Sequence, residues 1–291
     1  MTLHFEPLSL DRQDEYTQLL AQCGQKASDY SFVNLWGWAE EYGLQWAFWN
    51  DLAVLRQTRP EVLYWAPVGD WSRVDWKVFQ TMIPESQCFI RVPEQLKDIW
   101  VEQLFGVAVR ECRDHWDYLY SVRELVELKG KRFHKKKNLL NQFLKQVEYE
   151  FIPLDEETIE GALALQTEWF LWRHRESDMT LQAENRAIVK VMHDWRKLSG
   201  LFGAGLAVGG RMIAYTIAER LDRETVVIHF EKGCPNYKGV YQAMNQLFLA
   251  ISCQEYDLVN REQDLGDPGL RKSKESYNPV DHLQKFEICL G

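Results

Sequence analysis

The stretch LAVGGRMIAYTIAERLDRETVVIHFE, from Leu206 to Glu231, decides the fold class of this chain. It is typical of three strands, at Leu206–Val208, Arg211–Glu219 and Thr225–Glu231, because β-branched and aromatic residues dominate each run. The Gly209–Gly210 pair suits a tight turn between the first two strands. An antiparallel meander is therefore expected at the centre of this part of the chain.

Around the meander, apolar periodicity places further elements in a regular order. In the second half a strand is expected at 149–152, followed by helices at 155–173 and 181–198 and by the meander at 206–231. A helix at 239–251, a strand at 256–260, a helix at 269–276 and a strand at 283–288 are expected after it. The first half shows the same order, with its elements expected at 3–6, 11–22, 31–42, 45–66, 73–82, 88–92, 94–104 and 118–122. This repeat predicts two mixed α/β domains, 1–128 and 149–291, joined by a basic connecting helix within 129–148.

The composition is that of a folded protein. Of 291 residues, 46% are hydrophobic and 26% charged, which excludes a disordered chain and suffices for two cores. The first residues lack the apolar segment of a secretory signal, and the longest uncharged apolar run, Gly200–Gly210, is too short to span a bilayer. We therefore expect a cytoplasmic protein without a transmembrane segment; a peripheral position at the membrane surface stays open.

The cysteines and histidines show no metal-site or redox spacing. Six cysteines occur without a CxxC pair, so reduced and mostly buried thiols are expected. Cys234 lies in a turn where a nucleophile is conceivable, but no His or Asp stands beside it in the sequence. The seven histidines are scattered, and no metal site is expected.

A basic run stands out in an acidic chain. KGKRFHKKKN, residues Lys129–Asn138, holds six of the 34 lysines and arginines of a protein whose net charge is −9. Such a run is either a solvated helix face or a surface that binds an anion. We favour the second interpretation, with tRNA, a nucleotide-containing donor or a phospholipid headgroup as the anion. The candidate residues on the expected helix are Lys131, Arg132, Lys135, Lys136 and Asn138.

Charged and polar residues also gather where two expected strands end, at 231–232 and 260–274. The carboxyl ends of strands in α/β sheets face the usual ligand crevice, so these residues are expected to border one pocket. The alternative is a surface loop in which acids and bases pair with one another. Candidate bases are Glu231, Glu262 and Asp264, and the choice among them is open. Candidate anion-binding residues are Lys232, Asn260, Arg261, Arg271 and Lys274. His229 should share the strand face of Glu231 by alternation, either in the site or as a buried structural residue.

Several local sequences carry a resemblance to known proteins. They are Ser28–Phe32, Asp117–Tyr120 with Leu128–Asn138, His229–Lys232, Tyr237–Asn245 and Asn260–Lys274. Together they resemble a largely uncharacterised bacterial family related to the C-terminal domain of phosphatidylglycerol lysyltransferases, and akin to the Fem-type aminoacyltransferases. The resemblance implies an α/β (α+β) fold of two tandem GNAT-like domains with mixed central sheets.

In GNAT folds the phosphates of the acyl donor lie at the start of the helix after the meander, where backbone N–H groups and the helix dipole favour anions. Here that turn holds Lys238 and Gly239, and Gly239 permits close backbone approach. Bulky Tyr241 stands where coenzyme A binders carry Gly or Ala. The departure argues against a coenzyme A pyrophosphate and leaves room for another anionic donor; an ordinary helix start is the alternative.

The resemblance implies an acyl or aminoacyl transferase, with acyl-coenzyme A or aminoacyl-tRNA as the donor and an amine or hydroxyl of a lipid, peptide or small molecule as the acceptor. No other cofactor is expected. Such transfer needs positioned reactants, a donor to the developing oxyanion and a path for the leaving proton. Two alternatives stay open: a non-catalytic protein that binds tRNA or another anion on this scaffold, and an acetyl-coenzyme A N-acetyltransferase.

Overall fold

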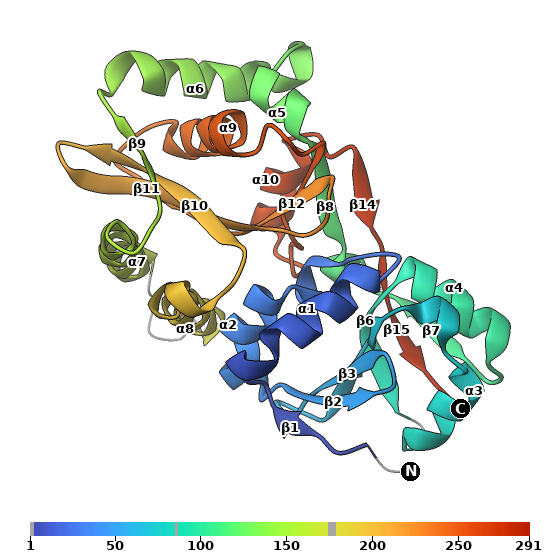
Figure 1. The fold of residues 1–291 in the computed structure, drawn as a ribbon. Helices are drawn as coiled ribbons and strands as arrows, with labels where there is room; N and C mark the ends of the chain where they lie inside the picture. The colour runs from blue at the N-terminus through green and yellow to red at the C-terminus, as the bar shows by residue number, and fades with distance from the viewer. Residues whose placement is uncertain (1–2, 85–86, 174–178) are drawn as a thin grey trace. The chain divides into compact units, whose positions relative to one another are not determined.

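The computed structural model describes residues 3–84, 87–173 and 179–291, and the chain divides into two compact units (Figure 1). Unit 1 comprises Met1–Asp117, Gln263–Pro268 and His282–Gly291, and unit 2 comprises Tyr118–Glu262 and Gly269–Asp281. Each unit contains one mixed sheet with helices packed on it, so the fold is mixed α/β as expected. Among the described residues, no helix is both long and apolar enough to cross a membrane.

The sheet of unit 1 has the strand order β1-β2-β3-β4-β6-β15-β7, with β5 pairing β3. Its elements are β1 Glu6–Pro7, α1 Gln13–Gln22, α2 Phe32–Tyr42, β2 Gln45–Trp49, β3 Leu52–Gln57, β4 Leu63–Trp65, β5 Val68–Gly69, α3 Trp76–Met82, β6 Cys88–Pro93, α4 Glu94–Gln103, β7 Ala108–Glu111 and β15 Lys285–Cys289. Local signals set several boundaries. Ser31 caps α2 by accepting a hydrogen bond from the N–H of Asn34, and Gly43 ends it in the left-handed region at φ 56°.

The sheet of unit 2 has the order β9-β10-β11-β12-β13-β8-β14. Its elements are β8 Asp117–Ser121, α5 Val122–Glu127, α6 His134–Gln146, β9 Glu150–Pro153, α7 Ile159–Arg173, α8 Met179–His193, β10 Leu201–Val208, β11 Arg211–Arg220, β12 Thr225–Gly233, α9 Val240–Ser252, β13 Leu258–Asn260, α10 Pro268–Glu275 and β14 Asp281–Leu283. Helix α9 packs on the sheet with α5 and α6 against it, and Figure 1 shows α7 and α8 across the sheet from α9.

The two sheets have the same strand order, but each contains one strand from the other half of the sequence. In unit 1, β15 pairs antiparallel with β6, and in unit 2, β8 pairs antiparallel with β13. Both strands occupy the next-to-last position of their sheet. The compact units therefore have other boundaries than the expected domains, 1–128 and 149–291: β8 and α5 belong to unit 2 and the last strand to unit 1. Local periodicity predicts that a strand exists, whereas its partner depends on tertiary packing.

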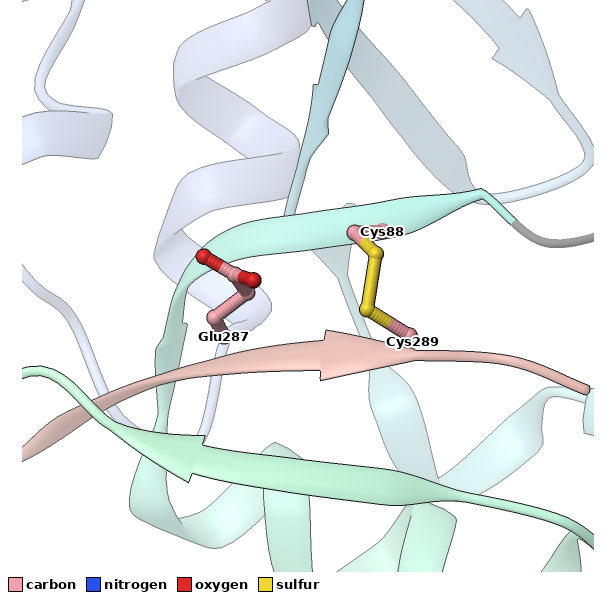
Figure 2. Close-up of side chains that lie close together, drawn as sticks. All are labelled: Cys88, Glu287 and Cys289. Carbon is pink, nitrogen blue, oxygen red and sulfur yellow. A yellow bond between two sulfur atoms is a disulfide. The ribbon is translucent and has the colours of Figure 1, made fainter.

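The expectation of six reduced thiols is wrong for one pair. Cys88 on β6 and Cys289 on β15 form a disulfide (Figure 2). The two residues stand directly opposite each other in the antiparallel register, although 201 positions separate them in the sequence. Cys23, Cys112, Cys234 and Cys253 are free thiols, and all but the half-buried Cys112 are buried.

Aromatic side chains fill the core of unit 1. Trp100 lies with its ring centroid 4.9 Å from that of Phe89 and 5.4 Å from that of Trp76, in edge-to-face contacts. All three rings are essentially inaccessible to solvent. Burial of one such side chain stabilises a fold by about 1.5–3 kcal/mol. An edge-to-face aromatic pair adds about 0.5–1.5 kcal/mol to this. The helices that carry Trp76 and Trp100 are thereby held on the sheet.

Candidate functional site

Strands β12 and β13 of unit 2 separate after a short parallel pairing. The register joins Thr225–Val227 to Leu258–Asn260 and ends there, while β12 continues to Gly233. Beyond this point the backbone of β12 has β11 as its only ladder partner in the described chain. The side chains that follow Val227 and Asn260 thus surround the gap between two diverging strand ends, which is where α/β sheets place their ligands.

Glu231 is the central acidic residue of this region. Its side chain is 8% exposed and lies 3.1 Å from Nη2 of Arg261, which follows β13. Thr216 Oγ1 donates to the same carboxylate over 3.4 Å and Asn245 Nδ2 over 3.5 Å, both near the limit of a hydrogen bond. Strand β11 and helix α9 therefore supply two weak donors, and the guanidinium provides most of the compensation for the buried charge.

Arg261 has donor capacity that the described residues do not use. Its Nη1 is buried and has no hydrogen-bond acceptor among them. The guanidinium lies 4.9 Å from the ring centroid of Tyr277, and the ammonium of Lys136 lies 3.7 Å from that centroid. Burial, together with the nearby Arg261, lowers the pKa of Lys136 to about 8. Two cations on one aromatic ring, one with an unused N–H group, form an arrangement that suits an anionic or oxyanionic group.

A second set of charges surrounds His229. The register of β12 against β11 shifts between Ile217 and Ala218, and His229 is the additional residue of this bulge. Its Nδ1 lies 2.8 Å from Glu262 Oε1, and its Nε2 lies 3.7 Å from Glu219 Oε1. Burial lowers the pKa of His229, but the hydrogen bonds to Glu219 and Glu262 outweigh it and raise this pKa to about 9. The imidazole is therefore a cation at neutral pH that orients Glu262.

The turn Asn260–Glu262 is held in a conformation that L-residues seldom adopt. Glu262 has φ 56°, and its N–H donates to Asn260 Oδ1 over 2.8 Å. Lys274 Nζ donates to the carbonyl oxygens of Arg261 and Glu262. Backbone strain of this kind, on the order of 1–3 kcal/mol, persists where the surroundings enforce it and is common at functional sites. Asn260 and Lys274, expected as anion binders, thus have polar contacts that shape the turn.

Other expected site residues have polar partners of their own. Lys232 is buried, with its Nζ 2.8 Å from Glu184 Oε1 and 4.1 Å from the ring centroid of Trp169. Asp264 belongs to unit 1, where it is fully buried, accepts from the N–H of Gly266 and lies 3.5 Å from Arg113. Arg271 is half-buried on α10. The carboxylate beside Lys232 belongs to Glu184, and the guanidinium beside Asp264 belongs to Arg113. Both partners come from distant parts of the sequence.

The start of α9 packs against α6. Gly239 precedes α9 at φ 88°, and a Cβ there would lie 2.3 Å from the carbonyl oxygen of Leu139 on α6. The close approach that this glycine permits is therefore made by the backbone of α6. Lys238 is exposed in the same turn, and the hydroxyl of Tyr241 accepts from Trp169 Nε1 over 3.0 Å.

The basic run begins before the regular helix. Lys131 and Arg132 lie in a 3-10 turn, and α6 starts at His134. Lys131, Lys135 and Asn138 are exposed, Arg132 pairs with Glu124, and Lys136 alone of the candidate lysines turns towards Tyr277. The run thus contributes one side chain to the cluster and leaves several cations on the surface.

Four residues around the charged pairs were not expected: Thr216, Glu219, Asn245 and Tyr277. They come from β11, α9 and the segment after α10, and no spacing in the sequence links them to Glu231 or His229. The alternation of β11 offered a weak signal, because Thr216 interrupts an apolar strand directly opposite Glu231. The other three residues show no such signal.

Comparison with known proteins gives relatives over most of the chain. An uncharacterised protein of Mycoplasmoides gallisepticum is 26% identical over 211 residues, which is 67% of this chain and 66% of the relative. A conserved protein of unknown function from Bacteroides thetaiotaomicron has a crystal structure that superposes with a TM-score of 0.88, at 29% identity and over 100% of both chains.

More distant structures share the fold. L-PGS from Bacillus licheniformis matches with a TM-score of 0.66 at 14% identity, over 98% of this chain and 92% of that chain. FemX matches with a TM-score of 0.60 at 7% identity, over 98% and 97%. The tandem, Fem-type architecture implied by the sequence is therefore confirmed. The profile of the family described as phosphatidylglycerol lysyltransferase, C-terminal, matches residues 20–289, and the chain belongs to this family.

Proposed function

We propose that unit 2 transfers an aminoacyl group from an aminoacyl ester, with aminoacyl-tRNA as the donor, to a hydroxyl or amine acceptor. The observation that carries the proposal is the largely buried Glu231–Arg261 pair at the diverging ends of β12 and β13, with Arg261 Nη1 lacking an acceptor among the described residues. The family description names a lysyltransferase that acts on phosphatidylglycerol, which supports this reaction class and makes a phospholipid headgroup the first acceptor to test.

Each part of the cluster has a chemical role in this proposal. The acceptor attacks the ester carbonyl carbon, and Glu231 takes the proton that the acceptor loses. Arg261 Nη1 donates to the carbonyl oxygen as negative charge develops on it. When the intermediate collapses, the carbon–oxygen bond to the tRNA ribose breaks, and Glu231 returns the proton to the departing hydroxyl. Acyl transfer of this kind needs no covalent enzyme intermediate.

Glu231 is the better candidate for the base than Glu262. The Glu262 carboxylate already accepts from the His229 imidazolium over 2.8 Å, and the backbone of its turn is strained. Both features suit a residue that orients the strand end. Glu231, in contrast, lies beside the unused guanidinium N–H group, so that base and oxyanion donor stand together.

The exposed part of the basic run, Lys131, Lys135 and Lys137, would guide a polyanionic donor to unit 2. Bulky Tyr241 in the first turn of α9, where coenzyme A binders carry Gly or Ala, supports a donor other than coenzyme A.

The test is a transfer assay with the purified full chain. Radiolabelled lysyl-tRNA and a panel of other aminoacyl-tRNAs are supplied with phosphatidylglycerol vesicles or with small amines, and acetyl-coenzyme A is tested in parallel. E231Q should lower kcat at least about a hundredfold, as expected for loss of a general base, while E148Q, at an exposed glutamate, should leave it unchanged. Transfer from acetyl-coenzyme A but from no aminoacyl-tRNA would refute the proposal.

A second measurement separates binding from catalysis. The variant K131Q/K135Q/K137Q should weaken tRNA binding. The slope of the logarithm of the binding constant against the logarithm of the salt concentration should fall by about one for each lost phosphate contact. K145Q, at the far end of the same helix, is the control. Binding of tRNA without transfer to any acceptor would favour the non-catalytic alternative.

A further inference from the structure

Three side chains with metal-binding atoms meet in unit 1, outside the proposed site. Cys88 on β6 and Cys289 on β15 are directly opposite each other, and Glu287 is two residues before Cys289. One ligand atom from each lies within 4.8 Å of the other two, and Figure 2 shows the three side chains between the two strands. Residues two positions apart on a strand share a face, so Glu287 and Cys289 project to the same side of β15.

The cluster is not enclosed in the core of unit 1. Each of the three residues is half-buried. Arg110 on β7 stands opposite Glu287 in the register and forms an ion pair with it. The two cysteines are held close by the pairing of β6 with β15, and this pairing also depends on backbone hydrogen bonds that do not involve the disulfide.

We propose that Cys88, Cys289 and Glu287 bind a thiophilic divalent cation of the zinc class when the disulfide is reduced. In the reducing step a dithiol is oxidised to its disulfide, and its two electrons and two protons convert the Cys88–Cys289 bond into two thiols. Binding of the cation then releases these two protons to solvent and forms two metal–sulfur bonds and one metal–oxygen bond. The site is absent from the oxidised chain, because both sulfurs are then bonded to each other.

The donor set and the charges suit zinc. Thiolates and a carboxylate are normal zinc ligands, and three protein ligands leave a fourth position for water. In a tetrahedral site with metal–sulfur bonds of about 2.3 Å, neighbouring ligand atoms are about 3.5–4 Å apart, which small side-chain rotations can reach from this arrangement. Two thiolates and a carboxylate exceed the charge of the cation by one, and the adjacent guanidinium of Arg110 balances that excess.

Such a site would keep the carboxy-terminal strand attached to β6 in a reducing compartment, where a disulfide is rare. The cation would bind the folded chain and not the unfolded one, since its ligands lie 199 and 201 residues apart in the sequence and meet only in the folded sheet. Metal binding would then stabilise unit 1 in proportion to the logarithm of the free metal concentration.

The test uses the full chain, reduced with a phosphine and desalted without oxygen, then titrated with Zn²⁺ or with Co²⁺ as a spectroscopic probe. We expect one equivalent of bound zinc, a thiolate-to-cobalt absorption band, and neither in the oxidised chain. C88S and C289S should each abolish the band. C253S, at a buried thiol of unit 2, is the control and should retain it.

E287Q keeps both cysteines and the disulfide, so it tests the third ligand even where a cysteine variant folds poorly. It should weaken zinc binding by about tenfold or more, as changes around zinc ligands commonly do. The proposal is overturned when the reduced chain binds no zinc, when oxidised and reduced chains bind it equally, when C253S loses the band, or when E287Q binds as tightly as the parent.

Discussion

Replacing Arg261 by Met removes the cation that lies 3.1 Å from the Glu231 carboxylate while keeping an unbranched side chain in the same space. The carboxylate is 8% exposed, and its other donors, Thr216 and Asn245, stand at 3.4 and 3.5 Å. An almost buried negative charge is thus left with two marginal hydrogen bonds. We expect R261M to lower the free energy of unfolding by about 3–5 kcal/mol, as breaking one side of a buried pair does.

Removing both charges should restore much of this loss. In E231Q/R261M the neutral amide no longer needs a counter-ion, so the double variant should be more stable than R261M alone. The coupling energy from the four proteins should reach about 2–3 kcal/mol. The measurement is urea unfolding followed by circular dichroism, analysed on the transition that E231Q shifts, because two compact units need not unfold together.

Additive effects, with a coupling energy below about 0.5 kcal/mol, would refute this reasoning, because they would mean that Arg261 does not compensate Glu231 in solution. Activity is measured on the same variants under conditions where each is folded. R261M should then still transfer poorly, since the proposed oxyanion donor is missing.

Three other predictions concern glycine packing, histidine protonation and the disulfide. G239A should destabilise the chain by more than about 2 kcal/mol, because a Cβ would lie 2.3 Å from the carbonyl oxygen of Leu139 on α6. Its control is G210A, which has a similar φ of 77° and open space around the Cβ and should lose only about 1 kcal/mol. Thermal unfolding measures both. Folding raises the pKa of His229 from 6.5 to about 9. The stabilisation of the fold by the protonated imidazole is therefore complete below pH 6.5 and is lost as the pH rises through 9. The Tm difference between parent and H229Q should shrink over that interval. C88S/C289S should lower the unfolding free energy of the oxidised chain by about 5 kcal/mol, at the upper end for disulfides, because the bond closes a loop with a sequence separation of 201. Equal Tm values for the oxidised parent and the double variant would contradict this.

Much of the secondary structure follows from local chemistry and was predictable. The helix expected at 31–42, the strands expected within 45–66 and the glycine hairpin at 209–210 occur in the structure, because each depends on neighbours in the sequence. Strand β7 was missed because its four residues are exposed and show no apolar alternation, and α5 was missed because its six residues follow β8 directly.

Only part of the candidate site could be predicted from the sequence. Glu231, Arg261 and Glu262 could be selected from the sequence because polar residues where apolar strands end are a local signal, and the structure brings them together. That signal selected Asp264 and Lys232 equally, whose partners are Arg113 and Glu184. The partners that compensate these charges lie between 30 and 151 positions away in the sequence.

The order of the elements, their repeat in both halves and the family resemblance follow from the amino-acid sequence. Tertiary packing sets which sheet contains β8 and which contains β15, and it produces the bulge at His229, the contact of Lys136 with Tyr277 and the Cys88–Cys289 pair. The two groups differ in the range of the interactions that they depend on. Caps, turns and periodicity act over a few residues, whereas strand pairing and the burial of charge join segments far apart in the chain, and their free energies depend on how the whole unit packs.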